Sequence, residues 1–235
     1  MAGGCRKKDD PVNTQSGLLR VSFSHFAGNQ PLSLNEAWHL NENGDSIKIH
    51  TYKYYVSNVK FITDSGMVYN EPESYHLIDE EVVSSKSFVV DGVPAGNYTK
   101  ISFLIGVDEE RNTSGAQTGA LDPGLGMFWD WNSGYIMARM EGFSPSSQFD
   151  FAYHLGGFNG KNSVLRSVTL DFPVSSQVNG STGMRNIHIK GDVLEWFKTP
   201  NLIKINEVNI VVGIGKDAAD LADNYADMFT IDHID

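Results

Sequence analysis

Apolar and polar residues alternate with a period of two along much of this chain, which is the pattern of half-buried β-strands. In residues 19–25, Leu19, Val21, Phe23 and His25 alternate with three polar residues. Residues 47–63 are rich in Ile, Thr, Tyr, Val and Phe and predict one long strand, or two strands joined by a bulge. The pattern predicts further strands at residues 75–79, 86–90, 99–106, 134–141, 148–155, 164–172, 185–190 and 207–213.

Gly, Asn and Pro separate these segments, and helical patterns are brief, at residues 192–198 and 217–228. Short strands at regular spacing favour a sandwich over βαβ units. The sequence therefore predicts an all-β fold: a single antiparallel β-sandwich, Greek-key-like, with long functional loops and one or two short helices.

Composition excludes several classes of protein. The chain has 235 residues, 40% of them hydrophobic, so it can bury a substantial core. Its net charge of −11 repels phosphate backbones, which argues against nucleic acid as a partner. One cysteine excludes a disulfide framework and the Cys-rich zinc modules. No apolar run approaches the roughly 20 residues of a membrane-spanning helix.

The N-terminus resembles the end of a lipoprotein signal peptide. Small residues precede the lone Cys5, and the basic and acidic residues after it resemble the signal that sends some Gram-negative lipoproteins to the outer membrane. We expect Cys5 to be lipidated, so that the membrane is a partner through this anchor alone; the alternative is a free terminal thiol. Residues 1–17 are then lipoprotein N-terminus and flexible tether, and residues 18–235 are the folded domain.

Residues 106–142 contain a long, polar, Gly-rich loop, and such loops are often functional. Its oxygen-bearing side chains offer hard ligands for Ca²⁺: Asp108, Glu109, Asn112 and Asp122. The loop leads into Trp129, Trp131 and Tyr135. These rings either cover the end of the core or line a cation or sugar site. The nearby Met127, Met137 and Met140 either pack in the core or offer soft sulfur to Cu(I).

The histidines differ in their expected surroundings. His25 shares the apolar face of its strand and should point inward, where both ring nitrogens need a hydrogen bond or a metal. His76 shares a face with Ile78 and should be half-buried, whereas His154 lies on the less apolar face of its strand and needs cover from another element to act as a ligand. His233, in an acidic tail, is a further ligand candidate; three others read as surface residues, namely His39, His50 and His188.

Several local motifs occur in an order that resembles the MbnP-like family, named for a periplasmic protein encoded beside methanobactin genes. The most specific is Trp-x-Trp-x-x-Gly-Tyr at residues 129–135, and the resemblance extends over nearly the whole chain from Leu18. The other motifs are Val-Ser-Phe-Ser-His at 21–25, Pro-Leu at 31–32, Tyr-Val-Ser-Asn-Val at 55–59, Tyr-His-Leu-Ile-Asp at 75–79, Glu-Gly at 141–142, His-Leu-Gly at 154–156, Asn-Tyr-Ala-Asp-Met-Phe at 224–229 and Asp-His at 232–233.

This resemblance implies a secreted or surface copper-binding β-sandwich. In such relatives Cu(I) is held by two His and a kynurenine, which a di-haem enzyme of the MbnH or cytochrome c peroxidase type makes from Trp. His76 and His154 match the two His ligands best, and His25 is a third candidate. Ser74 stands where a relative has the modified Trp, two residues before the ligand His. The precursor here is then Trp129 or Trp131, or no kynurenine forms.

Two hypotheses follow. The first is a lipid-anchored protein of the outer membrane, on its periplasmic or cell-surface side, that binds copper for acquisition or buffering. The second is a metal-free surface lipoprotein that binds glycan through Trp129, Trp131 and Tyr135. Enzymatic function is not expected, and no catalytic residues are assigned, because the chain lacks the nucleophile elbow, Walker and Rossmann motifs.

Overall fold

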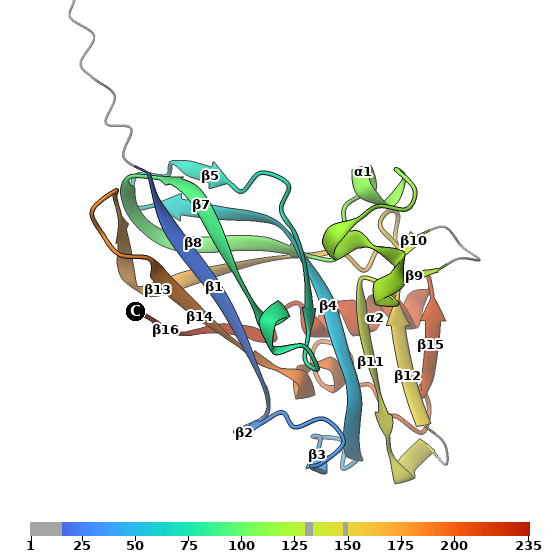
Figure 1. The fold of residues 1–235 in the computed structure, drawn as a ribbon. Coiled ribbons are helices and arrows are strands. Elements are labelled where there is room, and N and C mark those ends of the chain that lie inside the picture. The colour runs from blue at the N-terminus through green and yellow to red at the C-terminus, as the bar shows by residue number, and fades with distance from the viewer. Residues whose placement is uncertain (1–15, 130–133, 148–149) are drawn as a thin grey trace, which may run out of the picture.

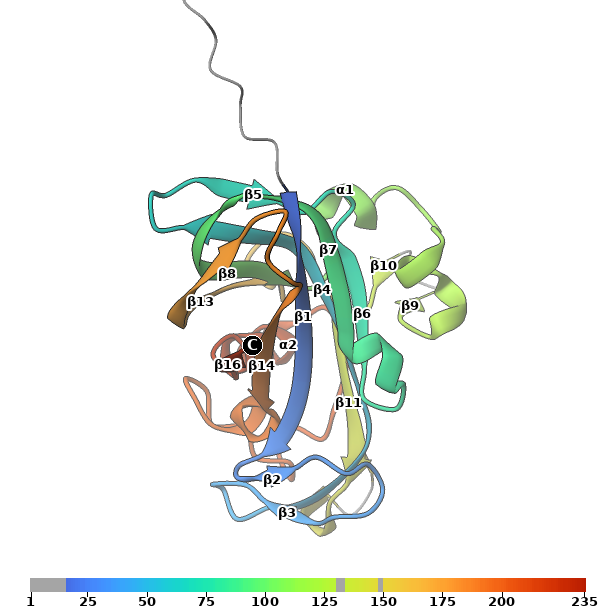
Figure 2. The ribbon, with the colours of Figure 1, turned by 60° about the vertical axis from the view of Figure 1, so that its left-hand side comes forward.

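The computed structural model describes residues 16–129, 134–147 and 150–235. Two β-sheets pack face to face, and a group of loops and short helices lies beside the larger one (Figure 1, Figure 2). The predicted all-β sandwich is therefore confirmed. The first strand begins at Ser16, two residues before the predicted start of the domain.

The first sheet has the order β16-β14-β1-β2, with β7 also paired to β1. Its strands are β1 (Ser16–Ala27), β2 (Gln30–Pro31), β7 (Ser87–Pro94), β14 (Arg185–Asp192) and β16 (Phe229–Ile234). In β1 the predicted alternation holds, because Leu19, Val21, Phe23 and His25 all face the interior. The last strand, β16, lies where the sequence predicts only a tail.

The second sheet has the order β13-β8-β4-β11-β12-β15, and β3, β5 and β6 also pair with β4. Its strands are β3 (His39–Leu40), β4 (Ser46–Thr63), β5 (Val68–Asn70), β6 (Tyr75–Asp79), β8 (Gly96–Ile105), β11 (Ala138–Phe143), β12 (Asp150–Leu155), β13 (Arg166–Val178) and β15 (Ile210–Gly213). Strand β4 is one long strand that contains the predicted irregularity. Its register with β8 shifts between Ser57 and Lys60, and Asn58 has a φ of 53° there.

The expectation of purely antiparallel sheets is wrong at two places. Strand β1 pairs with β14 in parallel, and so does β12 with β15. Both pairs join strands that are distant in sequence, with other strands and a helical segment between them, so the chain has room for the crossover that a parallel pair requires.

The helical segments are short. Helix α2 (Lys216–Tyr225) ends before the predicted residue 228, and the predicted helix at 192–198 is the 3₁₀ segment η5 (Val193–Phe197). The remainder are α1 (Glu109–Asn112), η1 (Val83–Lys86), η2 (Gly119–Leu121), η3 (Pro123–Leu125) and η4 (Pro145–Ser147). The predicted strand at 134–141 is divided into β10 (Gly134–Tyr135) and β11, and β10 pairs with β9 (Phe128–Trp129).

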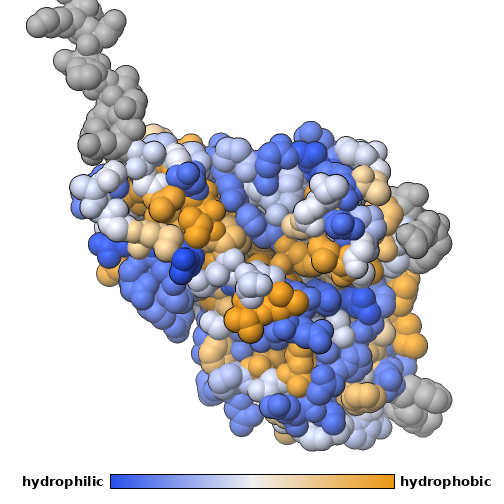
Figure 3. All heavy atoms as spheres, viewed as in Figure 1, coloured by the Kyte–Doolittle hydropathy of each residue, from blue (hydrophilic) through white to orange (hydrophobic). Residues whose placement is uncertain are grey.

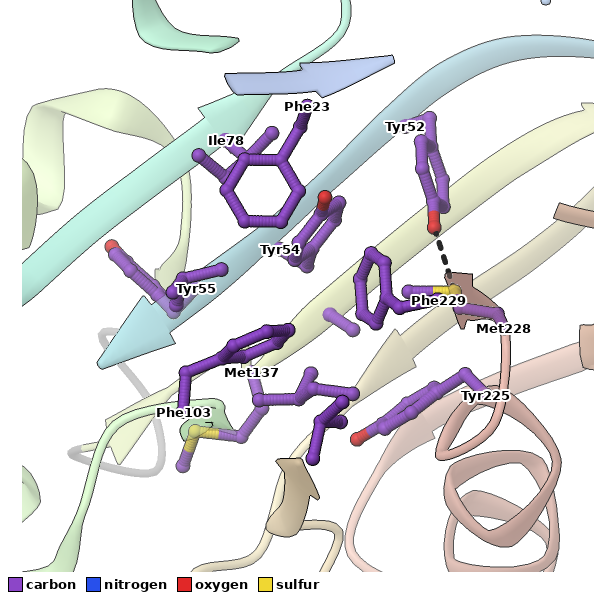
Figure 4. Packing of buried hydrophobic residues seen from close by; sticks show 14 of the residues in the cluster. Phe23, Tyr52, Tyr54, Tyr55, Ile78, Phe103, Met137, Tyr225, Met228 and Phe229 are labelled. Atoms are coloured by element: carbon purple, nitrogen blue, oxygen red, sulfur yellow. Dashed lines mark hydrogen bonds between the residues drawn. The ribbon is translucent and has the colours of Figure 1, made fainter. Parts of the chain in front are cut away.

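Aromatic residues from both sheets fill the core. The ring of Phe23 in β1 packs edge-to-face on Tyr54 in β4, on Phe103 in β8 and on Phe229 in β16. Figure 4 shows these four rings together, and its dashed line marks the hydrogen bond from the Tyr52 hydroxyl to the sulfur of Met228, 3.3 Å long. These edge-to-face contacts add to the free energy gained by burying apolar surface.

Exposed apolar residues form separate patches divided by hydrophilic ones on the face that Figure 3 shows. Scattered apolar surface of this kind is ordinary for a folded domain. Among the described residues no helix is both long and apolar enough to cross a membrane.

Candidate metal centre

The three histidines predicted as ligands each contact a different glutamate. His25 contacts Glu80, His76 contacts Glu71 and His154 contacts Glu141. A carboxylate that accepts a hydrogen bond from one imidazole nitrogen orients the ring and leaves the other nitrogen for a further partner. We therefore compare the second nitrogen of each ring.

His25 has both nitrogens occupied by the protein. Nδ1 lies 2.5 Å from Glu80 Oε2 and Nε2 lies 2.8 Å from the Tyr54 hydroxyl. Burial lowers the pKa of His25, although Glu80 opposes that shift, so the ring is neutral. Burial also raises the pKa of Tyr54 well above 10, so its hydroxyl is protonated and donates to Nε2. The inward orientation predicted for His25 is confirmed, and hydrogen bonds rather than a metal satisfy the ring.

His76 is half-buried, as predicted, and lies between the two sheets. Its ring stacks on Phe88 of β7 with centroids 3.5 Å apart and planes within 3° of parallel. Nε2 lies 2.9 Å from Glu71 Oε2, which also accepts from the Ser74 hydroxyl. The stacked ring and the shared carboxylate hold this imidazole against the core.

His154 projects from the less apolar face of β12, as predicted. Its Nε2 lies 2.6 Å from Glu141 Oε1, and Arg139 donates to the same oxygen over 2.9 Å. Burial raises the pKa of Glu141, but the hydrogen bond with His154 and the charge of Arg139 outweigh it and lower the pKa, so the carboxylate is charged. His50 Nδ1 lies 4.0 Å from the other oxygen of Glu141. Within the described part of the chain, Nδ1 of His154 has no hydrogen-bond partner.

His76 and His154 lie on opposite faces of the same sheet. His154 is opposite Arg139, which is opposite Lys53 in β4, and His76 is opposite Val56 in β4. Residues opposite each other in a ladder share a face, whereas Lys53 and Val56 are three residues apart and so point to different faces. From the sequence we expect these two histidines to bind one ion, and this expectation is wrong, because the structure places them on different faces.

The loop instead brings Trp129 to the strand of His154. A Cβ atom built on Gly156 would lie 2.0 Å from the Trp129 ring, so the indole rests directly on the glycine backbone. Gly156 directly follows the last residue of β12 and donates its N–H to the Gly213 carbonyl, so we extend the alternation of the strand to it, which directs its Cβ to the face of His154, roughly 7 Å along the chain. This contact brings the loop that carries Trp129 close to the end of the strand from which His154 projects.

Two of the three aromatic residues of the proposed glycan platform are covered. Trp129 is 6% exposed and Tyr135 is 1% exposed, so neither ring offers a free face on which a sugar could stack. Trp131 lies outside the described residues. Met127, Met137 and Met140 are fully buried, which favours their packing role.

The oxygens proposed for Ca²⁺ serve the local fold. The Asp108 carboxylate accepts from the backbone N–H of Arg111, from Asn58 and from the Tyr75 hydroxyl. Although burial acts in the other direction, these bonds lower the pKa of Asp108. Asn112 contacts the Val107 carbonyl and the backbone N–H of Tyr135, and Asp122 accepts from the N–H of Gly124. Glu109 lies in the first turn of α1 and contacts Asn159 over 3.3 Å. Among the described residues, the carboxylates of Asp108, Glu109 and Asp122 do not belong to a group of ligand atoms close enough to share one ion.

Two histidines expected at the surface are placed differently. His39 is 6% exposed, because β3 packs beside β4. His188 is half-buried and stacks on His233, and ligand atoms of His188, His233 and Asp235 lie within 4.8 Å of one another. The alternation of residues in β14 correctly predicts that His188 points outward. The pairing of β14 with β16 cannot be predicted from the residues of either strand alone.

Comparisons with known proteins agree on one family. The family model described as MbnP matches residues 16–213. Among solved structures, MbnP from Methylosinus trichosporium superposes with a TM-score of 0.57 at 14% sequence identity, over 86% of this chain and 83% of that one. At this identity the likeness shows a common fold. No curated protein matches the chain.

Proposed function

This chain belongs to the MbnP family, and we propose that it is a lipid-anchored, extracytoplasmic protein that binds copper for acquisition or buffering. Family membership supports an extracytoplasmic, copper-related role. The location that we propose is the outer membrane, on its periplasmic or cell-surface side.

The approach of Trp129 to the strand of His154 carries the proposal. An imidazole whose Nε2 is held by Glu141 directs its Nδ1 toward a further partner, and neutral imidazole is a good ligand for copper. The indole on Gly156 lies on the same face. We propose that His154 and an oxidised Trp129 contribute to one copper site.

Conversion of Trp to kynurenine removes one carbon from the side chain and adds one oxygen. The product would provide polar ligand atoms where the indole has none that suits copper. We propose a di-haem enzyme of the MbnH type as the oxidising partner. His50, whose Nδ1 lies 4.0 Å from the other oxygen of Glu141, offers an additional imidazole beside it.

The proposed anchor is Cys5, which lies outside the described residues. Residues 6–15 separate it from β1. Ten extended residues reach at most about 35 Å, so a lipid on Cys5 would keep the domain close to the membrane surface.

The test is Cu(I) affinity by competition with a chromogenic chelator, on protein made with the di-haem partner. The matched variants are His154→Ala and His76→Ala, two imidazoles paired with glutamate on opposite faces of one sheet. We expect at least a tenfold loss of affinity for His154→Ala, because a ligand is removed, and wild-type affinity for His76→Ala.

Intact mass provides a second readout. In a host that also expresses the di-haem partner, the mass of the protein should differ from the unmodified mass by the loss of one carbon and the gain of one oxygen. Trp129→Phe should abolish that difference. Wild-type Cu(I) affinity in the His154→Ala variant would refute the proposed ligand. If the protein has the unmodified mass and still binds copper with the same affinity, only the role of kynurenine is refuted.

A further inference from the structure

A second group of histidines lies on the first sheet, far along the chain from His154. His188 in β14 and His233 in β16 are directly opposite each other in an antiparallel pair. Their rings stack with centroids 4.0 Å apart and planes 14° from parallel. Because Ile187 and Ile189 on either side of His188 are buried, this ring projects from the outer face of the sheet.

A β-bulge shapes the group. The register shifts so that His188 is opposite His233 while Ile189 is opposite Ile231, which leaves Asp232 as the extra residue. The Asp232 carboxylate reaches His233, with Oδ2 2.7 Å from Nδ1. An acidic residue in this position holds the proton on Nδ1 and leaves the lone pair of Nε2 available.

His188 is oriented from the other side. The Ser22 hydroxyl donates to Asn186 Oδ1 over 2.8 Å, so the amide turns its NH₂ group toward Nε2 of His188, 2.5 Å away. An NH₂ group can only donate, and therefore this nitrogen carries a lone pair rather than a proton. The Asp235 carboxylate lies 3.4 Å from the same nitrogen.

The Nε2 lone pair of His188 accepts from Asn186, and a cation could take the place of that N–H, where it would bind the lone pair and the nearby Asp235 carboxylate together. We propose that His188, His233 and Asp235 form a metal site for a divalent transition ion of the Zn²⁺ or Cu²⁺ class. Two imidazoles and one carboxylate suit these ions, whereas Ca²⁺ and Mg²⁺ need more oxygen ligands.

The geometry is compatible with closure around an ion. One ligand atom from each residue lies within 4.8 Å of the others, and zinc–nitrogen bonds of about 2.0–2.1 Å require a modest contraction. His233 and Asp235 are exposed, so their side chains can move, and His188 would exchange its hydrogen bond from Asn186 for the ion. Three protein ligands leave a coordination position for water.

This site is separate from the proposed copper site. It lies on the other sheet, and His233 and Asp235 fall outside the family match at residues 16–213. Its ligands come from the neighbouring strands β14 and β16, and β16 carries Phe229 into the core. A bound ion would therefore fasten the last strand of the sheet and stabilise the folded state.

The experiment is calorimetric titration of the full chain with Zn²⁺ and, separately, with Cu²⁺. All samples carry Cys5→Ser and His154→Ala, because a free thiol and the proposed copper ligand would also bind these ions. We expect one ion per chain, at least tenfold weaker binding in His188→Ala and in His233→Ala, and a smaller loss in Asp232→Asn.

Thermal unfolding provides the second measurement and reports whether the variants fold. Zn²⁺ should raise the melting temperature of the parent chain and leave that of His233→Ala unchanged. Thr230→Ala, an exposed substitution on the same strand, should respond as the parent does. Parent-like affinity in both His→Ala variants, or no binding of either ion by the parent, would overturn the site.

Discussion

His25 shows how the protein accommodates an imidazole in its core. A neutral ring has one N–H and one lone pair, and Glu80 and Tyr54 provide the matching acceptor and donor. Glu80 also contacts Lys86, so the carboxylate that accepts from His25 is itself paired with a cation. Protonation would charge a ring that is 3% exposed, at a high desolvation cost.

This arrangement predicts a loss of stability in mild acid. The pKa of His25 is lowered below its usual 6.5 in the folded state, so below about pH 6.5 the unfolded chain binds a proton that the folded chain does not. The free energy of unfolding should fall as the pH decreases from 7.5 to 5.5, by at most about 1.4 kcal/mol per pH unit from this residue.

The variant that isolates this effect is His25→Gln, whose amide can donate to Glu80 and accept from Tyr54 without titrating. Urea unfolding at each pH should give a shallower pH dependence for this variant than for the wild type. The range stays above the usual pKa of 4.5 for the Glu80 carboxyl, which keeps the two titrations apart. Equal pH dependence in both proteins would contradict the role of His25.

At the scale of elements, the contact between the β9–β10 pair and the end of β12 brings together residues of the proposed copper site. It depends on Gly156, because the absence of a side chain lets the indole of Trp129 lie on the backbone. Trp129 is also opposite Gly134 in the antiparallel pair of β9 and β10, and this pairing fixes the backbone from which the indole projects. The position of the ring is therefore set by a glycine and a strand pair.

We predict that Gly156→Ala displaces Trp129. The added methyl would overlap the ring, and overpacking of this kind costs about 1–3 kcal/mol. Urea unfolding should show the loss, and Cu(I) affinity of the modified protein should fall with it. Gly183→Ala is the matched control, since no atom lies within 4 Å of its added Cβ. Wild-type stability and affinity in Gly156→Ala would show that the contact is dispensable.

At the scale of the whole molecule, the last strand joins the two layers. Strand β16 extends the first sheet beside β14, and Phe229 contacts Phe23 in that sheet and both Tyr54 and Phe103 in the other. Residues close to the end of the chain thus complete the core that begins with β1. The proposed divalent metal site lies on the outer face of the same strand.

Truncation of Phe229 should consequently affect the entire domain. Phe229→Ala leaves a cavity between the sheets and should lower the free energy of unfolding by about 3–5 kcal/mol. Denaturant unfolding with circular dichroism as the probe would measure it. Thr230→Ala, one residue along and exposed, should change stability by about 0.5 kcal/mol or less. Similar losses in the two variants would contradict a central position for Phe229.

The local pattern of the chain was sufficient to predict the all-β class, most strands and the direction of several side chains. The alternation in β1 and β12 directs His25 inward and His154 to the polar face, and both are observed. These properties follow from the two-residue period of a strand, which depends on neighbouring residues alone. The motifs around Trp129 and His154 likewise pointed to the family.

The local pattern could not predict which distant strands pair with each other. It places His76 and His154 on opposite faces, lays Trp129 on Gly156 and stacks His188 on His233. Each of these relations is decided by which strands become neighbours, in which direction and in which register, and burial of the shared core selects among the alternatives. For this reason the kinds of candidate ligand could be inferred from the sequence, whereas their grouping required the folded arrangement.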